Sequence, residues 1–125
     1  MLDARSWGFV LVAVAMSVFL ILFWSSFSVG VVRGMSMYPT LKSGDVIFLE
    51  TGRTGEVQIS AGDVIGYWPG PSYSAVAHRV VAVFPGFVLA KGDNFLTNPS
   101  VDPFPIFVSE IVGRVVCRFR LPFLT

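Results

Sequence analysis

An uncharged run from Trp7 to Phe27 constrains this chain more than any other feature. Between its tryptophans the run consists mainly of Val, Leu, Ile, Phe, Ala and Met, with a few Ser. A helix needs about 20 such residues to cross the hydrocarbon core of a bilayer, and backbone in lipid must form its own hydrogen bonds. Trp7 and Trp24 lie near the ends of the run, where aromatic side chains meet membrane interfaces. The run therefore predicts one transmembrane helix.

A cleaved signal peptide is the alternative interpretation of an N-terminal apolar segment. Its apolar core is normally about 7–15 residues long and precedes a cleavage site with small residues. The run here is longer and no such site follows it, so we expect a retained anchor. Charges hardly determine its orientation, because Asp3 and Arg5 precede it and Arg33 follows it. A short tail before a single span is usually cytoplasmic, which predicts that the rest of the chain is extracytoplasmic or lumenal.

The composition agrees with a membrane-anchored protein of one domain. Apolar residues make up 54% of the chain, charged residues 14%, and the mean hydropathy is +0.71. With the anchor placed at residues 1–28, residues 29–125 suffice for one compact domain and are too few for two. The net charge of +1 gives no reason to expect nucleic acid as a partner. The single cysteine, Cys117, excludes an internal disulfide and a cysteine-rich metal site, and we expect it to be buried.

After the anchor, short runs with β-branched and aromatic residues alternate with turn residues. Breaks such as Ser43-Gly44, Ala61-Gly62 and Pro85-Gly86 bound these runs, and the last of them predicts a tight hairpin. No useful helical period of apolar residues follows the anchor. The pattern predicts a mainly β domain, a small antiparallel barrel or folded sheet. The predicted strands are residues 29–32, 45–50, 63–68, 76–84, 87–91 and 111–119.

Four polar residues are candidates for chemistry. A serine hydroxyl becomes a nucleophile when a base takes its proton, and Ser36 and the single histidine, His78, could form such a pair. A carboxylate that fixes the imidazole tautomer would complete the arrangement, and either Asp93 or Asp102 could supply it. Each also has an ordinary explanation, since a histidine on an apolar strand face is more often structural and Gly-Asp-Asn makes a common turn. Taken singly, these residues establish no site.

Their order along the chain matches a known family. The matching segments are Gly34-Met35-Ser36-Met37-Tyr38-Pro39-Thr40-Leu41, Gly44-Asp45, Gly62-Asp63-Val64-Ile65, His78-Arg79-Val80-Val81, Lys91-Gly92-Asp93-Asn94 and Ile111-Val112-Gly113-Arg114. In this order behind a membrane anchor, the chain resembles the type I signal peptidases. The similarity is to the endoplasmic-reticulum and archaeal branch, in which histidine stands where most bacterial members carry a lysine base. It covers the anchor and nearly the whole domain.

The resemblance implies a membrane-bound serine endopeptidase that cleaves signal peptides from exported preproteins after small residues. Ser36 matches the family nucleophile and His78 its general base. Asp102 matches the partner of the histidine and Asp93 a supporting residue, but both aspartates remain candidates. The sequence departs from the family at residues 95–97, Phe-Leu-Thr, and the stretch between the aspartates is longer. The resemblance implies no metal and no other cofactor.

The resemblance also implies partners and a location. Signal peptides would be the substrates, bound as an extended strand beside a sheet edge, with residues 29–35 and 65–68 as candidate pocket walls. Membrane lipid would surround the anchor, and further subunits of a peptidase complex or translocon could join it. The protein would reside in the cell membrane, or in the endoplasmic-reticulum membrane of a eukaryote.

Two alternatives to this activity stay open. One is a catalytically inactive β-domain that acts as a membrane-anchored scaffold in a secretion complex, which would be expected to have lost Ser36, His78 or both aspartates. The other is a relative that cleaves itself or a repressor, which would use a lysine base. Lys42 and Lys91 are the lysines of this chain, and neither occupies the position that matches the base.

Overall fold

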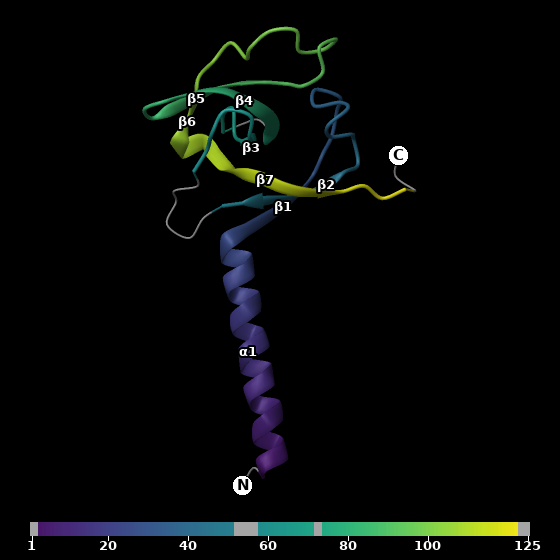
Figure 1. Ribbon diagram of the computed structural model, residues 1–125, viewed down its shortest axis with the longest axis vertical. Helices are drawn as coiled ribbons and strands as arrows, with labels where there is room; N and C mark the ends of the chain where they lie inside the picture. The colour runs from purple at the N-terminus through teal and green to yellow at the C-terminus, as the bar shows by residue number, and fades with distance from the viewer. Residues whose placement is uncertain (1–2, 52–57, 72–73, 123–125) are drawn as a thin grey trace.

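A long helix projects from a β domain in the computed structural model, which describes residues 3–51, 58–71 and 74–122 (Figure 1). Helix α1 (Ala4–Ser26) begins after Asp3, whose carboxylate accepts a hydrogen bond from the backbone N–H of Ser6 at 2.9 Å. None of its residues is buried against the rest of the protein. The helix predicted from the uncharged run is confirmed, and it is long and apolar enough to cross a membrane.

Strand β1 (Phe27–Val31) starts at the residue after α1, so helix and sheet are joined without a linker. The ring of Phe23 in the last turns of α1 stacks on that of Phe27, with ring centroids 5.0 Å apart. The backbone N–H of Phe27 still donates to the carbonyl of Phe23 and closes the helix. Helix α1 is therefore directly continuous with one edge of the sheet.

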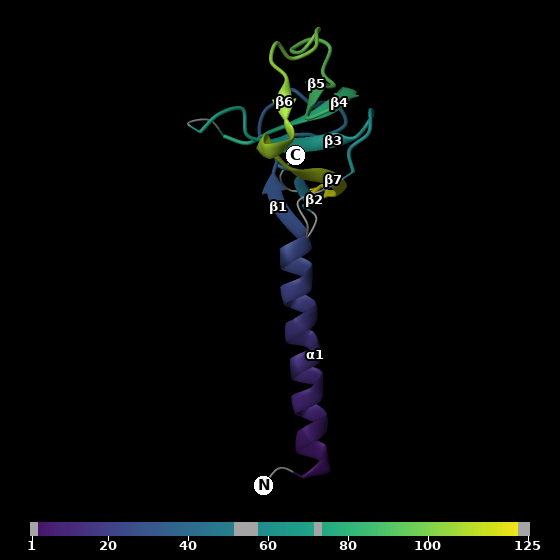
Figure 2. The same cartoon turned by 90° about the vertical axis from the view of Figure 1, so that its left-hand side faces the viewer.

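Seven antiparallel strands form a single sheet in the order β1-β2-β7-β3-β4-β5-β6, which curls into half a barrel (Figures 1 and 2). The last long strand, β7, lies between β2 and β3 and so joins the N-terminal strand pair to the rest of the sheet. A short 3-10 helix, η1 (Val108–Glu110), precedes β7. The other strands are β2 (Val46–Glu50), β3 (Val64–Tyr67), β4 (Val76–Phe84), β5 (Phe87–Lys91), β6 (Ile106–Phe107) and β7 (Ile111–Phe119).

The mainly β, antiparallel fold predicted from the sequence is confirmed. The runs predicted at 76–84, 87–91 and 111–119 coincide with β4, β5 and β7. Pro85-Gly86 forms the predicted tight hairpin, in which Phe84 pairs with Phe87 and Gly86 adopts a φ of +84° that favours glycine. Strand β6 was not predicted, because its two residues follow a proline and are too short to show alternation.

Two hydrophobic clusters lie on opposite faces of the sheet. The first contains Ile65 and Val80, and alternation along β4 buries His78 on the same side. Ala77, the residue before His78, packs against the second cluster on the other side. The buried members of the first cluster are Ile65, Tyr67, Val80, Val88, Ala90 and Ile106, and those of the second are Met37, Leu41, Ile47 and Leu49.

The expectation that Cys117 is buried is wrong, because this residue is exposed on β7. A bulge in the pairing of β2 with β7 places Leu49 opposite Val115 but Phe48 opposite Cys117. The cysteine therefore shares a face with Phe48 and Phe119, whose rings meet edge to face at 5.6 Å. Phe119 is likewise exposed, so both side chains are accessible to solvent on this face.

A buried aspartate attaches the end of β7 to the turn before β2. Asp45 is 1% exposed and accepts hydrogen bonds from Nε and Nη2 of Arg120, both at 3.0 Å. It also accepts one from the backbone N–H of Lys42 at 2.9 Å. The Arg120 guanidinium is the main reason that the pKa of Asp45 lies below its ordinary value of 3.8. The more exposed Arg118 lies 3.7 Å from the same carboxylate.

Replacing this carboxylate should destabilise the fold in a pH-dependent way. Because the folded-state pKa of Asp45 lies below the ordinary value of 3.8, its charge stabilises the fold above that pH. The contribution is lost as the pH falls through the folded-state pKa. Asp45→Asn should lower the free energy of unfolding by about 2 kcal/mol near pH 7 and by less below about pH 4. Chemical unfolding in detergent, followed by circular dichroism, measures the free energy of unfolding at each pH.

Arg118→Gln is the matched control, because its side chain makes only the longer 3.7 Å contact with Asp45. It should lower the free energy of unfolding by less than about 1 kcal/mol. An Asp45→Asn penalty that grows towards low pH would contradict the assigned sign.

Candidate active site

Ser36 lies in a tight turn that follows β1. Gly34 enters the turn with a φ of +88°, which glycine adopts without strain. The carbonyl of Ser36 accepts a hydrogen bond from the backbone N–H of Asn94 at 2.9 Å, and the buried Asn94 amide donates to the Met35 carbonyl at 2.9 Å. Both bonds attach the serine turn to the segment that follows β5.

Gly92 allows this turn to approach the sheet closely. A Cβ atom at Gly92 would lie 2.5 Å from the carbonyl oxygen of Ser36 and 2.7 Å from Cγ of Asn98. In the pairing of β4 with β5, Arg79 lies opposite Lys91. The missing side chain therefore lets the serine turn lie against the end of β5, the strand that pairs with β4, which carries His78.

His78 forms a buried hydrogen-bonded group with Asp102 and Tyr67. The histidine is 7% exposed, and its Nδ1 lies 2.6 Å from Oδ2 of Asp102. The Tyr67 hydroxyl donates to the same oxygen at 3.1 Å. Since an ionised carboxylate only accepts hydrogen bonds, this network assigns the ring proton to Nδ1. Nε2 of the neutral ring is then the nitrogen that can accept a proton.

The segment between β5 and β6 places Asp102 in this group. The backbone N–H of Asp102 donates to the carbonyl of Ala90 at 2.8 Å, so the segment returns alongside β5. Ala90 belongs to the first hydrophobic cluster, on the face where His78 is buried. The return of the segment therefore brings the Asp102 carboxylate to the imidazole.

Asp93 has different partners on the other face of the sheet. Its carboxylate accepts hydrogen bonds from Nε and Nη2 of Arg79 at 2.8 and 2.7 Å, and from the Thr40 hydroxyl at 2.6 Å. The bonds from Arg79 are the main reason that the pKa of Asp93 is lowered, and those from Thr40 add to the effect. Hydrogen bonding to Asp93 likewise raises the pKa of Arg79. The structure thus brings Asp102 to His78 and Asp93 to Arg79.

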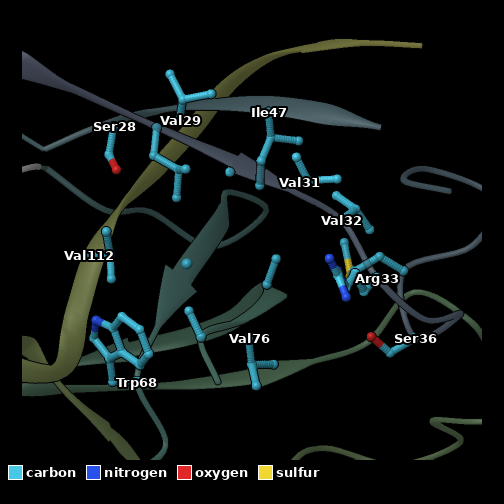
Figure 3. A pocket seen from close by; sticks show the side chains of 16 residues that line it. Ser28, Val29, Val31, Val32, Arg33, Ser36, Ile47, Trp68, Val76 and Val112 are labelled. Atoms are coloured by element: carbon cyan, nitrogen blue, oxygen red, sulfur yellow. The ribbon is translucent and has the colours of Figure 1, made fainter. Parts of the chain in front are cut away.

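Ser36 lines an apolar cavity of about 310 Å³ (Figure 3). Its hydroxyl points into the cavity from one end, while Trp68 and Val112 lie at the other. Gly30 and Gly66 contribute no side chain to the lining. The lining takes residues 29–33 from the first predicted pocket wall, and Gly66 and Trp68 from the second. The free edge of β1 runs along this cavity, because β1 is the first strand of the sheet.

The nucleophile and base candidates are not hydrogen-bonded to each other. Within residues 3–51, 58–71 and 74–122, the Ser36 hydroxyl makes no hydrogen bond. His78 lines a second cavity, of about 440 Å³, together with Asp102 and Phe104, and Val76 lines both cavities. Substrate-free enzymes often show long or poorly aligned catalytic hydrogen bonds. The separation is therefore compatible with a pair that aligns when substrate binds.

The sequence did not predict the contacts that two residues make in this site: Tyr67 was assigned only to the candidate pocket wall 65–68, and Asn94 was assigned no role. Tyr67 could have been placed on the His78 face, since alternation in the preceding strand puts it on the side of Ile65. Its contact with Asp102 had no sequence signal, because it depends on the path of a long segment. Asn94 belongs to the Lys91-Gly92-Asp93-Asn94 motif, but its attachment to the serine turn depends on contacts between segments about 60 residues apart.

In the part of the chain that the structure describes, no group of three or more His, Cys, Asp or Glu side chains could hold a metal ion. No family model and no curated protein matches the chain. The function must therefore be inferred from the residues and geometry of the site.

Adding a methyl group at Gly92 should disturb the serine turn. In Gly92→Ala the new Cβ would lie 2.5 Å from the backbone carbonyl oxygen of Ser36, so backbone must move. We expect the free energy of unfolding to fall by about 1–3 kcal/mol, as for other overpacked sites, measured by chemical unfolding in detergent.

Gly30→Ala is the matched control, because its nearest neighbour is a side-chain atom of Ile47 at an ordinary 3.6 Å. It should change the free energy of unfolding by less than about 0.5 kcal/mol. Equal penalties for the two variants would contradict the close approach at Gly92.

Proposed function

We propose that this chain is a membrane-anchored serine endopeptidase that removes signal peptides from exported preproteins. The observation that carries the proposal is the buried 2.6 Å contact between His78 Nδ1 and the Asp102 carboxylate, in a chain whose Ser36 turn packs closely against Gly92 at the end of β5. A base with a fixed tautomer beside a serine is the arrangement that activates a hydroxyl for acyl transfer. The motif order that resembles type I signal peptidases supplies the substrate class.

In the first step, Ser36 Oγ would attack the scissile carbonyl carbon while His78 Nε2 takes the hydroxyl proton. Asp102 would hold Nδ1–H and stabilise the imidazolium that forms. The proton would then pass to the leaving amine, whose bond to the carbonyl carbon breaks. Water would hydrolyse the resulting acyl-enzyme with His78 again as base, which regenerates Ser36.

The developing oxyanion requires hydrogen-bond donors. The backbone N–H of Ser36 makes no hydrogen bond within the described segments of the chain, so it is available for this role. One such donor contributes about 100- to 1,000-fold in rate. Gly34 precedes the nucleophile by two residues, where some lysine-type relatives have a hydroxyl, so a second donor would come from backbone or water.

The edge strand and the apolar cavity support an extended peptide as substrate. The free edge of β1 can pair with a peptide backbone, and the cavity beside it can take alternate side chains. Helix α1 runs directly into β1 (Figure 1), and residues of β1 line the cavity. A signal peptide leaving the bilayer would reach this edge first. Small side chains before the cut would fit beside Ser36.

The alternative function is a catalytically inactive scaffold in a secretion complex. It is favoured by one observation, that the Ser36 hydroxyl forms no hydrogen bond with His78 in the described structure. Cleavage assays separate the two functions directly.

Substitutions in the site should separate chemical roles from structural ones. Ser36→Ala and His78→Ala should abolish cleavage of a model preprotein in detergent or liposomes. Asp102→Asn should lower kcat by about 10³- to 10⁴-fold, because the imidazole loses its orienting acceptor. Asp93→Asn should act mainly through stability, since its carboxylate contacts Arg79 and Thr40. Initial rates and circular dichroism of each variant provide the comparison.

Lysine substitutions provide the control. Lys42→Ala and Lys91→Ala should retain cleavage, and loss of activity in either one, with its fold intact, would point to a lysine base. Full activity of Ser36→Ala would overturn the mechanism. A folded but inert wild type, tested with several preproteins, would favour the scaffold.

The proposed location of the domain can be tested through the single cysteine. Cys117 is exposed on β7, so a membrane-impermeant maleimide should label intact cells or right-side-out vesicles if the domain is extracytoplasmic. For a reticulum protein, sealed microsomes should label only after permeabilisation. Cys117→Ser should remain unlabelled in every case. Labelling of right-side-out vesicles only after lysis would place the domain on the cytoplasmic side.

A further inference from the structure

Tyr67 is a buried polar residue that the mechanism above does not use. It is 6% exposed and lies on β3, the neighbour of the strand that carries His78. Its hydroxyl donates to Oδ2 of Asp102 at 3.1 Å, and His78 Nδ1 lies 2.6 Å from that same oxygen. The tyrosine and the histidine therefore share one acceptor atom.

The geometry indicates how the three groups share their protons. If Nδ1 carries the ring proton, the 3.5 Å separation between the Tyr67 oxygen and Nδ1 is a contact between two donors. Both donors then point at one carboxylate oxygen of Asp102. The second donor restricts where that carboxylate can lie, although Asp102 belongs to a loop and not to a strand.

We propose that Tyr67 is a positioning residue that holds the Asp102 carboxylate against His78 and takes up part of its negative charge. The inference rests on the proposed function, since it adds a residue to the same site. Burial is the main cause of a raised pKa of the Tyr67 hydroxyl, and the charge of Asp102 adds to it. Tyr67 therefore remains a proton donor while a histidine titrates.

The charged neighbours determine the sign of the expected effect. Asp102 and Tyr67 face the imidazole directly, and Glu110 at the end of η1 acts on Tyr67 from the neighbouring segment. Arg79 is directed to Asp93 on the other face. Without the Tyr67 hydroxyl, the carboxylate would act on the imidazolium with less of its charge neutralised. The protonated ring should then persist to higher pH.

The single histidine makes a direct test simple, because its NMR signals in histidine-labelled protein need no assignment. The ring is titrated in the full chain, in detergent micelles, for wild type and Tyr67→Phe. The titration midpoint of the His78 ring should rise by about 0.5 pH unit in Tyr67→Phe, because Asp102 loses one hydrogen bond. Tyr38→Phe makes the same chemical change at a residue that is 40% exposed, and its midpoint should match wild type.

Kinetics provide a second readout. Tyr67→Phe should lower kcat by about tenfold with KM nearly unchanged, and should move the acid limb of the pH–rate profile to higher pH. In an Asp102→Asn background, adding Tyr67→Phe should cause little further loss, because the shared acceptor is already altered. If the two substitutions lower kcat additively in the double variant, the inference is overturned. A titration midpoint of His78 in Tyr67→Phe equal to that of wild type would also overturn it.

A complementary measurement does not depend on the fold of Tyr67→Phe. Incorporating 3-fluorotyrosine in a Tyr38→Phe, Tyr73→Phe protein, in which Tyr67 is the remaining tyrosine of the sequence, makes the Tyr67 hydroxyl a stronger donor with little change in shape, so the midpoint of the His78 titration should fall. An unchanged midpoint would overturn the inference. If the wild type cleaves no preprotein, the proposed function fails, while the titrations still decide whether Tyr67 acts on His78 through Asp102. If Ser36-dependent cleavage is present and the midpoints do not move, the Tyr67 inference alone fails.

Discussion

The arrangement of the site depends on the alternation of two adjacent residues in β4. His78 faces the side of the sheet where it is buried and meets Asp102, whereas Arg79 faces the other side and binds Asp93. Both aspartates belong to the segment that follows β5, so one strand holds this segment at two points. A shift of β4 by one residue would exchange the two faces and separate both pairs.

The Arg79–Asp93 pair also helps to position the proposed nucleophile. Thr40, a few residues beyond Ser36, donates to the Asp93 carboxylate, and Asn94 bonds the backbone on the other side of the serine. The serine turn is thereby attached to the segment that brings Asp102 to His78. Stability and the geometry proposed for catalysis are therefore coupled, because removal of Asp93 would leave Arg79 without its bidentate acceptor.

The direct continuity of α1 with β1 joins a helix that is long and apolar enough to cross a membrane to an edge strand of the sheet. The strand begins at Phe27 directly after the helix, and the cavity that Ser36 lines runs along it. A flexible linker would let the domain rotate relative to the bilayer, whereas the stacked rings of Phe23 and Phe27 couple helix and strand. This geometry suits a substrate that arrives from the membrane, as the proposed function requires.

Local patterns in the amino-acid sequence predicted the helix and most strands, because apolar length and two-residue alternation are local properties. The motifs also identified the candidates Ser36, His78, Asp93 and Asp102. Which aspartate meets His78, the contact of Tyr67 with that pair and the exposure of Cys117 follow from the tertiary structure. These outcomes depend on the return of a long segment along β5 and on a bulge in β7. Contacts between distant segments arise when the sheet closes, and local patterns do not encode its register.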